Sequence, residues 1–393
     1  MSFLIIRYSE IALKGKNRHW FEKILVENIK KKLKEKISVD FTIERISGRI
    51  FLSITSLKNE EKEKINQILQ NIFGITNFSW VEKASLDIEN ISYQCWKLIK
   101  RKRFNTFRIT TQRSNKKFFL TSEKINQQVG AFIFQKIIEK GKKPQVRLKN
   151  PDLECFIEIN DKNSFVYLQK IKGIKGLPVG SSGKALALLS GGIDSPVASY
   201  YALKRGVHTD YIHFHALPYT KPDSIQKVIQ LAKILSKFQN QNKLFLFPLG
   251  KIQKYIAENS PEKFRLLLYR RLMHRITSQI AREKKYLALY TGESVGQVAS
   301  QTLENLAVTN QASDLIMLRP LIGMDKEEII KIAQKIGTYE ISILPHEDLC
   351  SRFVPKHPAT KAHLKTIQNI ENKLNLQDLI QESLDKVEIK TFN

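Results

Sequence analysis

Cysteine is scarce in this 393-residue chain, which contains only Cys95, Cys155 and Cys350. Their spacings are unrelated, and no C-x-x-C pair occurs. A disulfide framework or a zinc knuckle needs cysteines at regular spacing, so the sequence argues against both. The missing C-x-x-C also makes a cysteine-bound iron–sulfur cluster an unfavourable interpretation.

Long hydrophobic runs are also missing. No apolar stretch reaches the roughly 20 residues that a membrane-spanning helix needs. The opening residues, MSFLIIRYSEIALKGK, are too few and too polar for a signal peptide. We therefore expect no membrane segment and a cytoplasmic location.

Acidic residues are few relative to basic ones, with 38 Asp and Glu against 65 Lys and Arg and a net charge of +27. Residues 1–180 alone carry +18, and the longer remainder carries +9. Such an excess favours a polyanionic partner, most simply nucleic acid. An AT-rich genome that places Lys and Asn on the surface would explain part of the lysine count, but it explains the local clusters less easily.

Residues 1–80 predict a ferredoxin-like α+β domain. The run FLIIRY predicts a strand, and residues 17–36 predict an amphipathic helix with its apolar side chains on one stripe. VDFTIERI and RIFLSI flank Ser47-Gly48 as the strands of a hairpin do. A second helix ends at Gly74, and ITNFSWV predicts a last strand. The order βαββαβ is that of a ferredoxin-like sandwich.

Residues 81–170 predict a second α/β domain with a basic surface. A helix near residues 91–99, the strand FNTFRITTQ and a helix over 121–140 are followed by the strands PQVRLKN, LECFIEI and SFVYLQK. Basic residues gather around the first strand with phenylalanines between them. This pattern is typical of RNA binding, although we expect most of the phenylalanines to lie in the core. The candidate RNA-binding residues are Lys100, Arg101, Lys102, Arg103, Arg113, Lys116 and Lys117.

The third segment predicts a doubly wound parallel sheet. The linker IKGIKGLPVGSSGK precedes five strand-like runs, LALLS, VHTDYIHFH, KLFLFPL, YLALYT and DLIMLRP, which alternate with helical stretches. In such a sheet, ligands bind beyond the carboxyl ends of the strands.

The stretch ALALLSGGIDSP, residues 185–196, joins the first of these strands to a helix. Ser195 is a good N-cap and Pro196 suits the first helical turn. Gly191 and Gly192 leave the backbone open, so that N–H groups can face an anion at the start of the helix. The stretch therefore predicts a phosphate-binding loop, although a plain strand–helix turn is the simpler alternative.

Neither the Walker A string nor the G-x-G-x-x-G dinucleotide pattern occurs in this chain. The string S-G-G-x-D-S instead resembles the PP-loop of the ATP pyrophosphatases. Enzymes of that class split ATP between the α and β phosphates and adenylate a substrate.

Further strings extend this resemblance along nearly the whole chain. They are RYSEIALKGKNR, SGGIDSPVASYYALKRG, HFHALPYT, YRRLMHRI, TGESVGQVASQTLENL, RPLIGMDKEEI and HEDLCSRFVPKHP. Together they resemble the tRNA 4-thiouridine synthetases, also called tRNA uracil 4-sulfurtransferases, a family tied to thiazole and thiamine biosynthesis. The resemblance implies a ferredoxin-like domain over 1–60, whose last helix and strand run to about 80, a THUMP RNA-binding domain over 61–168, a linker over 169–183 and a PP-loop domain over 184–393.

The resemblance implies ATP with Mg²⁺ as cofactors, bound at the strand ends. Asp194 would hold the metal or orient the α-phosphate, Arg270 would neutralise triphosphate charge, and His213 and Phe214 would contribute backbone contacts. The implied ATP-binding residues are Leu188, Leu189, Ser190, Gly191, Gly192, Ser195, His213, Phe214, Arg270, Gly292 and Gln301. No metal ligand set is certain.

Two further residues are implied to take part in catalysis. Lys326 lies in G-M-D-K-E-E-I, where the family has an important lysine, although an ordinary first-turn helix lysine is an equal alternative. Cys350 lies among charged and polar residues that suit a reactive thiolate. The resemblance makes it a persulfide carrier or a resolving thiol, whereas Cys95 and Cys155 occupy apolar core positions.

The implied function is ATP-dependent conversion of uridine to 4-thiouridine at position 8 of tRNA. Some relatives carry a C-terminal rhodanese domain, and this sequence shows none, so the expected sulfur donor is a cysteine desulfurase or another persulfide carrier. A homodimer is a further expectation. Two alternatives remain: another PP-loop tRNA-modifying enzyme, or a non-catalytic RNA-binding protein.

Overall fold

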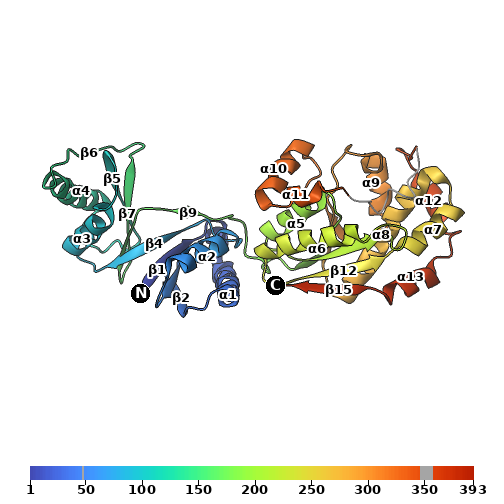
Figure 1. Ribbon diagram of the computed structural model, residues 1–393, viewed down its shortest axis with the longest axis horizontal. Helices are drawn as coiled ribbons and strands as arrows, with labels where there is room; N and C mark the ends of the chain where they lie inside the picture. The colour runs from blue at the N-terminus through green and yellow to red at the C-terminus, as the bar shows by residue number, and fades with distance from the viewer. Residues whose placement is uncertain (47, 346–356) are drawn as a thin grey trace. The chain divides into compact units, whose positions relative to one another are not determined.

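The computed structural model describes residues 1–46, 48–345 and 357–393. The chain divides into two compact units, Met1–Gly176 and Leu177–Asn393, which are shown together in Figure 1 and described separately below.

The first lobe of unit 1 has the predicted βαββαβ order. Its four strands form an antiparallel sheet in the order β2-β3-β1-β4, and the predicted ferredoxin-like fold is confirmed. Leu25, Ile29 and Leu33 of the first helix are fully buried against the sheet. The elements are β1 (Ser2–Arg7), α1 (Arg18–Lys36), β2 (Phe41–Ile46), β3 (Arg49–Ile54), α2 (Asn59–Gln70) and β4 (Asn77–Ala84), with short 3-10 turns at Glu10–Leu13 and Gly15–Asn17.

The second lobe extends the same sheet. Strand β4 pairs with β1 along its first half and with β8 along its last three residues, so one strand belongs to both lobes. The order continues β8-β7-β5-β6, and β9 pairs with the start of β4. The elements are α3 (Ile88–Ile99), β5 (Thr106–Arg113), α4 (Ser122–Ile138), β6 (Gln145–Val146), β7 (Leu153–Ile159), β8 (Ser164–Tyr167) and β9 (Ile171–Lys172).

Two details of the second lobe refine the sequence-based prediction. Thr121 caps α4, accepting a hydrogen bond from the amide of Lys124. The strand predicted over PQVRLKN is wrong in length, because only Gln145–Val146 pairs with β5. The chain leaves the extended region soon afterwards, at Asn150, whose φ of 49° lies in the left-handed region.

Cys95 of α3 and Cys155 of β7 both lie in the core of this lobe and are fully buried. Burial raises the pKa of the Cys95 thiol, and the neighbouring Cys155 thiol raises it further. Cys95 therefore stays in the unreactive thiol form at neutral pH.

Unit 2 contains the predicted parallel sheet, in the order β14-β13-β10-β11-β12-β15. Five strands are parallel, which confirms the prediction, and β15 (Glu388–Phe392) adds an unpredicted antiparallel edge beside β12. The other strands are β10 (Lys184–Leu188), β11 (His208–His215), β12 (Asn242–Pro248), β13 (Ala288–Tyr290) and β14 (Ile316–Leu318).

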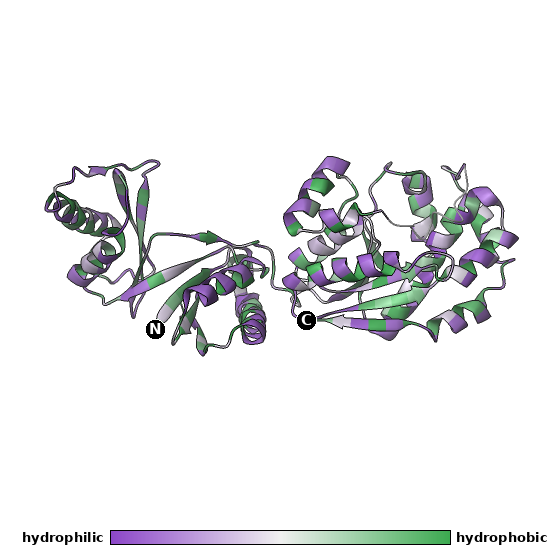
Figure 2. Ribbon diagram, viewed as in Figure 1, coloured by the Kyte–Doolittle hydropathy of each residue, from purple (hydrophilic) through white to green (hydrophobic). Residues whose placement is uncertain are grey.

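Helices cover both faces of this sheet (Figure 1). Leu186, Ile212 and Phe245 pack with apolar side chains of α7 and α8 in one large core. In Figure 2, α6 carries both hydrophobic and hydrophilic residues, as a helix with one buried face does. The helices are α5 (Asp194–Lys204), α6 (Asp223–Leu235), α7 (Gly250–Asn259), α8 (Arg265–Glu283), α9 (Leu303–Asn310), α10 (Lys326–Ile336), α11 (Tyr339–Ser342), α12 (Leu364–Glu371) and α13 (Gln377–Leu384).

In the part of the chain that the structure describes, no helix combines the length and the apolar character needed to cross a membrane.

Candidate functional site

The candidate site lies at the carboxyl ends of β10 and β13, which are neighbours in the sheet. The chain winds outward from β10 in one direction through β11 and β12, and in the other through β13 and β14. In a doubly wound sheet, this switch point leaves a crevice that can hold a ligand. The loop Ser190–Ser195 follows β10, and Gly292 follows β13, so both sequence-predicted elements meet there.

Hydrogen bonds between Ser190 and Ser195 connect the two ends of this loop. Ser195 Oγ accepts a hydrogen bond from the Ser190 amide at 2.9 Å and lies 3.1 Å from Ser190 Oγ. The expectation that Ser195 caps the helix is wrong, because α5 begins one residue earlier, at Asp194, and has no side-chain cap. The Ser195 hydroxyl instead fixes the loop, and the uncapped start of α5 remains a suitable place for an anion.

Asp194 is the centre of the charged contacts beside this loop. Its Oδ1 lies 2.6 Å from Lys326 Nζ, and its Oδ2 accepts a hydrogen bond from Gln297 Nε2 at 2.8 Å. Lys326 is the first residue of α10, and Asp325 caps that helix. Asp194 and Lys326, two of the three residues that the sequence assigned to catalysis, lie 132 positions apart in the chain and are in direct contact.

Gly292 is needed where β13 comes closest to the loop. A Cβ atom at this position would lie 2.7 Å from the Asp194 carbonyl carbon and the Ser195 amide nitrogen. Such contacts are impossible without backbone movement, so only glycine fits. Gly292 thus sets the distance between the two strand ends rather than presenting a side chain to a ligand.

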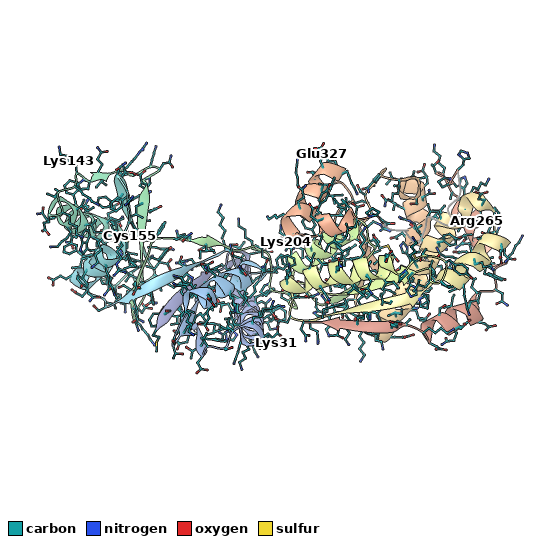
Figure 3. The ribbon with its side chains drawn as sticks, viewed as in Figure 1. Lys31, Lys143, Cys155, Lys204, Arg265 and Glu327 are labelled. Atoms are coloured by element: carbon teal, nitrogen blue, oxygen red, sulfur yellow. The ribbon has the colours of Figure 1, made fainter. Side chains whose placement is uncertain are left out.

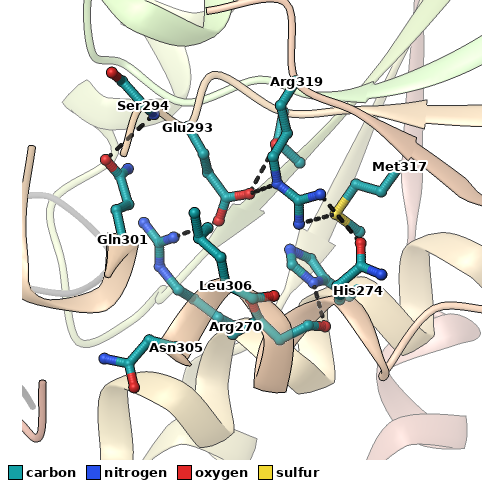
Figure 4. A network of polar contacts seen from close by, with 12 residues as sticks. Arg270, His274, Glu293, Ser294, Gln301, Asn305, Leu306, Met317 and Arg319 are labelled. Carbon is teal, nitrogen blue, oxygen red and sulfur yellow. Dashed lines mark hydrogen bonds and ion pairs between the residues drawn. The ribbon is translucent and has the colours of Figure 1, made fainter. Parts of the chain in front are cut away.

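Sequence reasoning missed Glu293, the next residue. Its carboxylate lies 2.6 Å from Arg270 Nη1 and 2.7 Å from Arg319 Nε, and it accepts a hydrogen bond from Thr291 (Figure 4). Only 6% of the Glu293 side chain is exposed, against 23% for Arg270. The buried carboxylate therefore fixes Arg270, while Arg270 keeps an accessible edge.

Burial alone would raise the pKa of Glu293, but the charges of Arg270, His274 and Arg319 outweigh it, and the pKa lies below the ordinary value. His274 is buried behind the arginines, and burial lowers the pKa of its imidazole. Its Nδ1 lies 3.1 Å from the Thr309 carbonyl oxygen. The network therefore holds one ionised carboxylate between two cations.

The remaining predicted ATP-binding residues surround the same strand ends. Leu189 donates its amide to the Ile212 carbonyl, and its own carbonyl lies 3.0 Å from His213 Nδ1. Phe214 is buried in the core, whereas Leu188 is half-buried. Gln301 is buried and accepts a hydrogen bond from the Ser294 amide at 3.4 Å (Figure 4).

Two more contacts show how the loop is supported. Ser342 of α11 donates a hydrogen bond to the Gly192 carbonyl at 3.3 Å. Buried Lys227 donates to the carbonyls of Ser342 and Leu344 at 2.8 and 2.7 Å. Neither Ser342 nor Lys227 belongs to a recognisable motif, so sequence reasoning could not find them.

Cys350 lies outside the described residues. Within the described ranges, no group of three or more His, Cys, Asp or Glu side chains could hold a metal ion.

The predicted RNA-binding residues form two surfaces rather than one. Lys100, Arg101, Lys102 and Arg103 are exposed immediately before β5, whereas Lys116 and Lys117 are exposed after its last residue. An eight-residue strand is about 25 Å long, so the two groups lie at opposite ends of β5.

Arg113, at the carboxyl end of β5, has a structural function. Its Nη1 donates to the carbonyls of Phe118 and Leu120, at 3.0 and 2.5 Å, and so shapes the loop that presents the lysines. Phe107 and Phe118 are buried, as expected for core residues, and Phe119 is 70% exposed.

Three protein-family models match successive segments of the chain, which correspond to the two lobes of unit 1 and to unit 2. The model of a thiamine biosynthesis protein (ThiI) matches residues 180–376, that of the ThiI ferredoxin-like domain matches 3–79, and that of the THUMP domain matches 86–169.

Curated relatives match over almost the full length. A probable tRNA sulfurtransferase of Caldanaerobacter subterraneus is 43% identical over 384 residues, which cover 98% of each chain. One of Moorella thermoacetica is 41% identical over 388 residues, covering 99% of this chain and 97% of the relative. The solved structure of a 4-thiouridine synthetase–RNA complex with bound ATP is 36% identical, covers 100% of both chains and has a TM-score of 0.89. The chain therefore belongs to the tRNA sulfurtransferase family, whose members are transferase enzymes.

Proposed function

We propose that this chain uses ATP to convert uridine at position 8 of tRNA to 4-thiouridine. The observation that carries the proposal is the contact of Asp194 with Lys326 and Gln297, beside the Ser190–Ser195 loop at the switch point of the sheet. The similarity to a synthetase solved with RNA and ATP supports the same assignment.

ATP would bind with its phosphates along Ser190–Ser195, at the start of α5. Backbone amides and the helix dipole favour the negative charge there. Lys326 and Arg270 would supply cations, and each is already oriented by a carboxylate, Asp194 or Glu293. This arrangement stabilises the charge that develops as pyrophosphate leaves.

Mg²⁺ would fit this site through one protein carboxylate, that of Asp194. Mg²⁺ commonly keeps several waters and binds one or two carboxylates together with substrate phosphates, so a single carboxylate is enough. When bound, the ion would neutralise phosphate charge. Lys326 occupies part of this position in the structure described here, 2.6 Å from Asp194 Oδ1.

The uridine O4 would attack the α-phosphate, breaking the bond to the β-phosphate and releasing pyrophosphate. The terminal sulfur of a persulfide would then attack C4, and AMP would leave with the former O4. A second thiol would then attack the sulfur of the carrier cysteine and form a disulfide with it, which breaks the S–S bond to the transferred sulfur and leaves that sulfur on C4. We assign the persulfide to Cys350, because Cys95 and Cys155 are buried in the second lobe. A cysteine desulfurase is the proposed source of the sulfur.

The first test separates the adenylation step from RNA binding. Asp194→Asn should abolish tRNA-dependent ATP–pyrophosphate exchange and leave the affinity for tRNA nearly unchanged. Asp378→Asn is the control for the same change of charge, since Asp378 also lies in the first turn of a helix, α13, but is exposed, whereas Asp194 is half-buried. Normal exchange by the Asp194 variant would contradict the assignment.

The second test separates adenylation from sulfur transfer. Cys350→Ser should still adenylate tRNA but make little 4-thiouridine with an enzymatic sulfur donor, because a hydroxyl cannot carry sulfane sulfur. Cys95→Ser and Cys155→Ser should lower stability without blocking sulfur transfer. A normal rate of thiolation by the Cys350 variant would exclude it as the carrier.

A further inference from the structure

Lys227 and Ser342, which belong to no recognisable motif, connect α6 to the Ser190–Ser195 loop by hydrogen bonds in series. Lys227 of α6 is only 5% exposed, and its ammonium donates to the carbonyls of Ser342 and Leu344 at 2.8 and 2.7 Å. Ser342 of α11 in turn donates its hydroxyl to the Gly192 carbonyl at 3.3 Å. A helix that contributes no predicted ligand-binding residue is therefore connected to the loop where phosphates are expected.

Lys227 fixes the end of α11. The last carbonyls of a helix have no partner within the helix and carry partial negative charge, so an ammonium group stabilises them. Since this lysine is buried, its loss would leave the two carbonyls without their donor and without water to replace it. Helix α11 has only four residues, Tyr339–Ser342, which is too short for a stable helix by itself. Its position therefore depends on outside contacts such as Lys227.

The helices α10 and α11 contact the loop at two points. Only two residues separate α10 from α11. At the start of α10, next to Glu327 (labelled in Figure 3), Lys326 lies 2.6 Å from Asp194. At the end of α11, Ser342 contacts Gly192. One helical segment thus holds two loop positions that are two residues apart, and Lys227 anchors that segment.

The Gly192 carbonyl is important because of the amide on the same peptide bond. In a trans peptide the C=O and the N–H point in opposite directions, so the Ser342 hydroxyl orients the N–H of Ile193 away from α11. Ile193 immediately precedes the first residue of α5. Amides at the start of a helix lack partners within the helix and are available to an anion.

We propose that Lys227 and Ser342 are positioning residues for the adenylation reaction. Lys227 fixes the end of α11, Ser342 fixes the Gly192–Ile193 peptide, and the Ile193 amide then meets a phosphate of ATP. Both side chains act through the loop and touch no reacting atom. The inference rests on the proposed function only in taking ATP as the ligand of this loop.

The test uses three variants of the full-length protein: Lys227→Met, Ser342→Ala and the double variant. Methionine replaces the lysine with an uncharged side chain of similar length, and alanine removes one hydroxyl only. Lys32→Met is the control for loss of a buried lysine, and Ser92→Ala is the control for loss of a buried hydroxyl that donates to a backbone carbonyl. Both controls lie in unit 1. The melting temperature of each variant verifies folding.

The first measurement is amide hydrogen exchange of the protein without ligand. The peptide that contains residues 189–195 should exchange about 2- to 10-fold faster in Lys227→Met and in Ser342→Ala, as expected for loss of one hydrogen bond, and should be unchanged in the controls. Unchanged exchange of this peptide in both variants would overturn the inference and leave the proposed function intact.

The second measurement is tRNA-dependent ATP–pyrophosphate exchange at saturating tRNA. Lys227→Met should lower kcat by about 100-fold, as small displacements of a positioned group do, and leave the KM for ATP within about twofold. Ser342→Ala should lower kcat by about 2- to 10-fold. Because both residues act on one peptide, the double variant should be no slower than Lys227→Met.

Further outcomes separate positioning from a merely structural role. Losses that multiply in the double variant would mean that Lys227 does not act through Ser342, and would overturn the inference. Lys227→Arg, which keeps a buried cation and its donors, should restore most of kcat. If Lys227→Met does not fold, a normal kcat for Ser342→Ala is sufficient to overturn the inference. Absence of exchange activity in the wild-type protein would instead refute the proposed function.

Discussion

Two carboxylates with little exposure, Glu158 in unit 1 and Glu293 in unit 2, each contact two arginines but lie at very different positions in the fold. Glu158 lies on β7 and accepts hydrogen bonds from Arg7 at 2.8 Å, Arg49 at 3.4 Å and Tyr167 at 2.7 Å. Its two arginines come from β1 and β3, so the cluster joins the two lobes of unit 1 through side chains.

Glu293 also holds two arginines, but it follows the carboxyl end of β13, beside the loop of the candidate site. In both clusters burial raises the pKa of the carboxyl, but the arginines lower it by more, so the pKa lies below the ordinary value and each carboxylate is ionised. The same arrangement of one carboxylate and two arginines can therefore join parts of a fold or fix an arginine beside the candidate site. Position at the strand ends, rather than the cluster itself, decides which.

The largest effect should come from Glu293→Gln. Loss of the charge leaves Arg270 and Arg319 without their shared partner, so Arg270, the proposed ligand of the triphosphate, loses the carboxylate that fixes it. We expect the rate of tRNA adenylation to fall by about 100-fold or more, as when one oriented donor is removed from an active site. The measurement is single-turnover AMP formation, with exposed Glu304→Gln as the control. A rate within threefold of wild type would mean that Glu293, like Glu158, stabilises the fold and does not assist adenylation.

Glu158→Gln should lower the stability of unit 1 and leave ATP binding nearly unchanged. Removing one partner from a buried ion cluster costs about 3 kcal/mol of unfolding free energy. Peptides of β1, β3 and β7 should exchange their amide hydrogens faster, whereas the affinity for ATP should stay within about twofold of wild type. A large loss of ATP binding would mean that the difference between the two clusters is not one of position.

Gly292→Ala tests the close packing between the end of β13, next to Glu293, and the backbone of the Ser190–Ser195 loop. The added Cβ meets the backbone of Asp194 and Ser195, and overpacking of this kind costs about 1–3 kcal/mol. Gly323→Ala is the control, because nothing lies within 4 Å of its Cβ. Thermal unfolding and pyrophosphate exchange should both change for the first variant only. Equal behaviour of the two variants would refute the close approach.

The smallest effect is a dependence on pH. The pKa of Glu158 is lowered in the folded protein, so its stabilisation is complete above the ordinary glutamate value of 4.5 and is lost as the pH falls through the folded pKa. The difference in unfolding free energy between wild type and Glu158→Gln should therefore be constant near neutral pH and shrink below 4.5. If this difference in unfolding free energy instead grew as the pH fell, the pKa of Glu158 would be raised in the folded protein, and the ion cluster would be contradicted.

Much of the fold could be predicted because it depends on local patterns. Alternating and apolar runs predicted the strands, and the glycine loop after β10 predicted where the chain would open a crevice. The length of β6 could not be predicted, because only two of its residues lie beside β5 and can form hydrogen bonds with it. Strand β15 was missed because EIKTF is mostly polar, as suits an exposed edge.

The candidate site was predictable only where a motif marks it. Asp194 and Lys326 lie in recognisable strings, but their contact depends on the fold. Arg270 and Arg271 are adjacent and look alike in the sequence. Arg271 points away and is fully buried, with a bidentate pair to Glu371 at 2.8 and 2.9 Å. Which of the two arginines pairs with Glu293 beside the candidate site is decided by helical phase and by the distant partners of each side chain.

Strand β4 has a consequence for cooperativity. Residues 77–81 pair with β1 and residues 82–84 pair with β8, so one uninterrupted backbone takes part in both hydrogen-bond ladders. Two domains joined by a flexible linker can unfold one after the other. In unit 1, loss of one hydrogen-bond ladder of β4 would leave an unpaired strand edge in the sheet of the other lobe. Unit 1 should accordingly unfold in a single transition, and chain breaks near residue 82 should damage both lobes together.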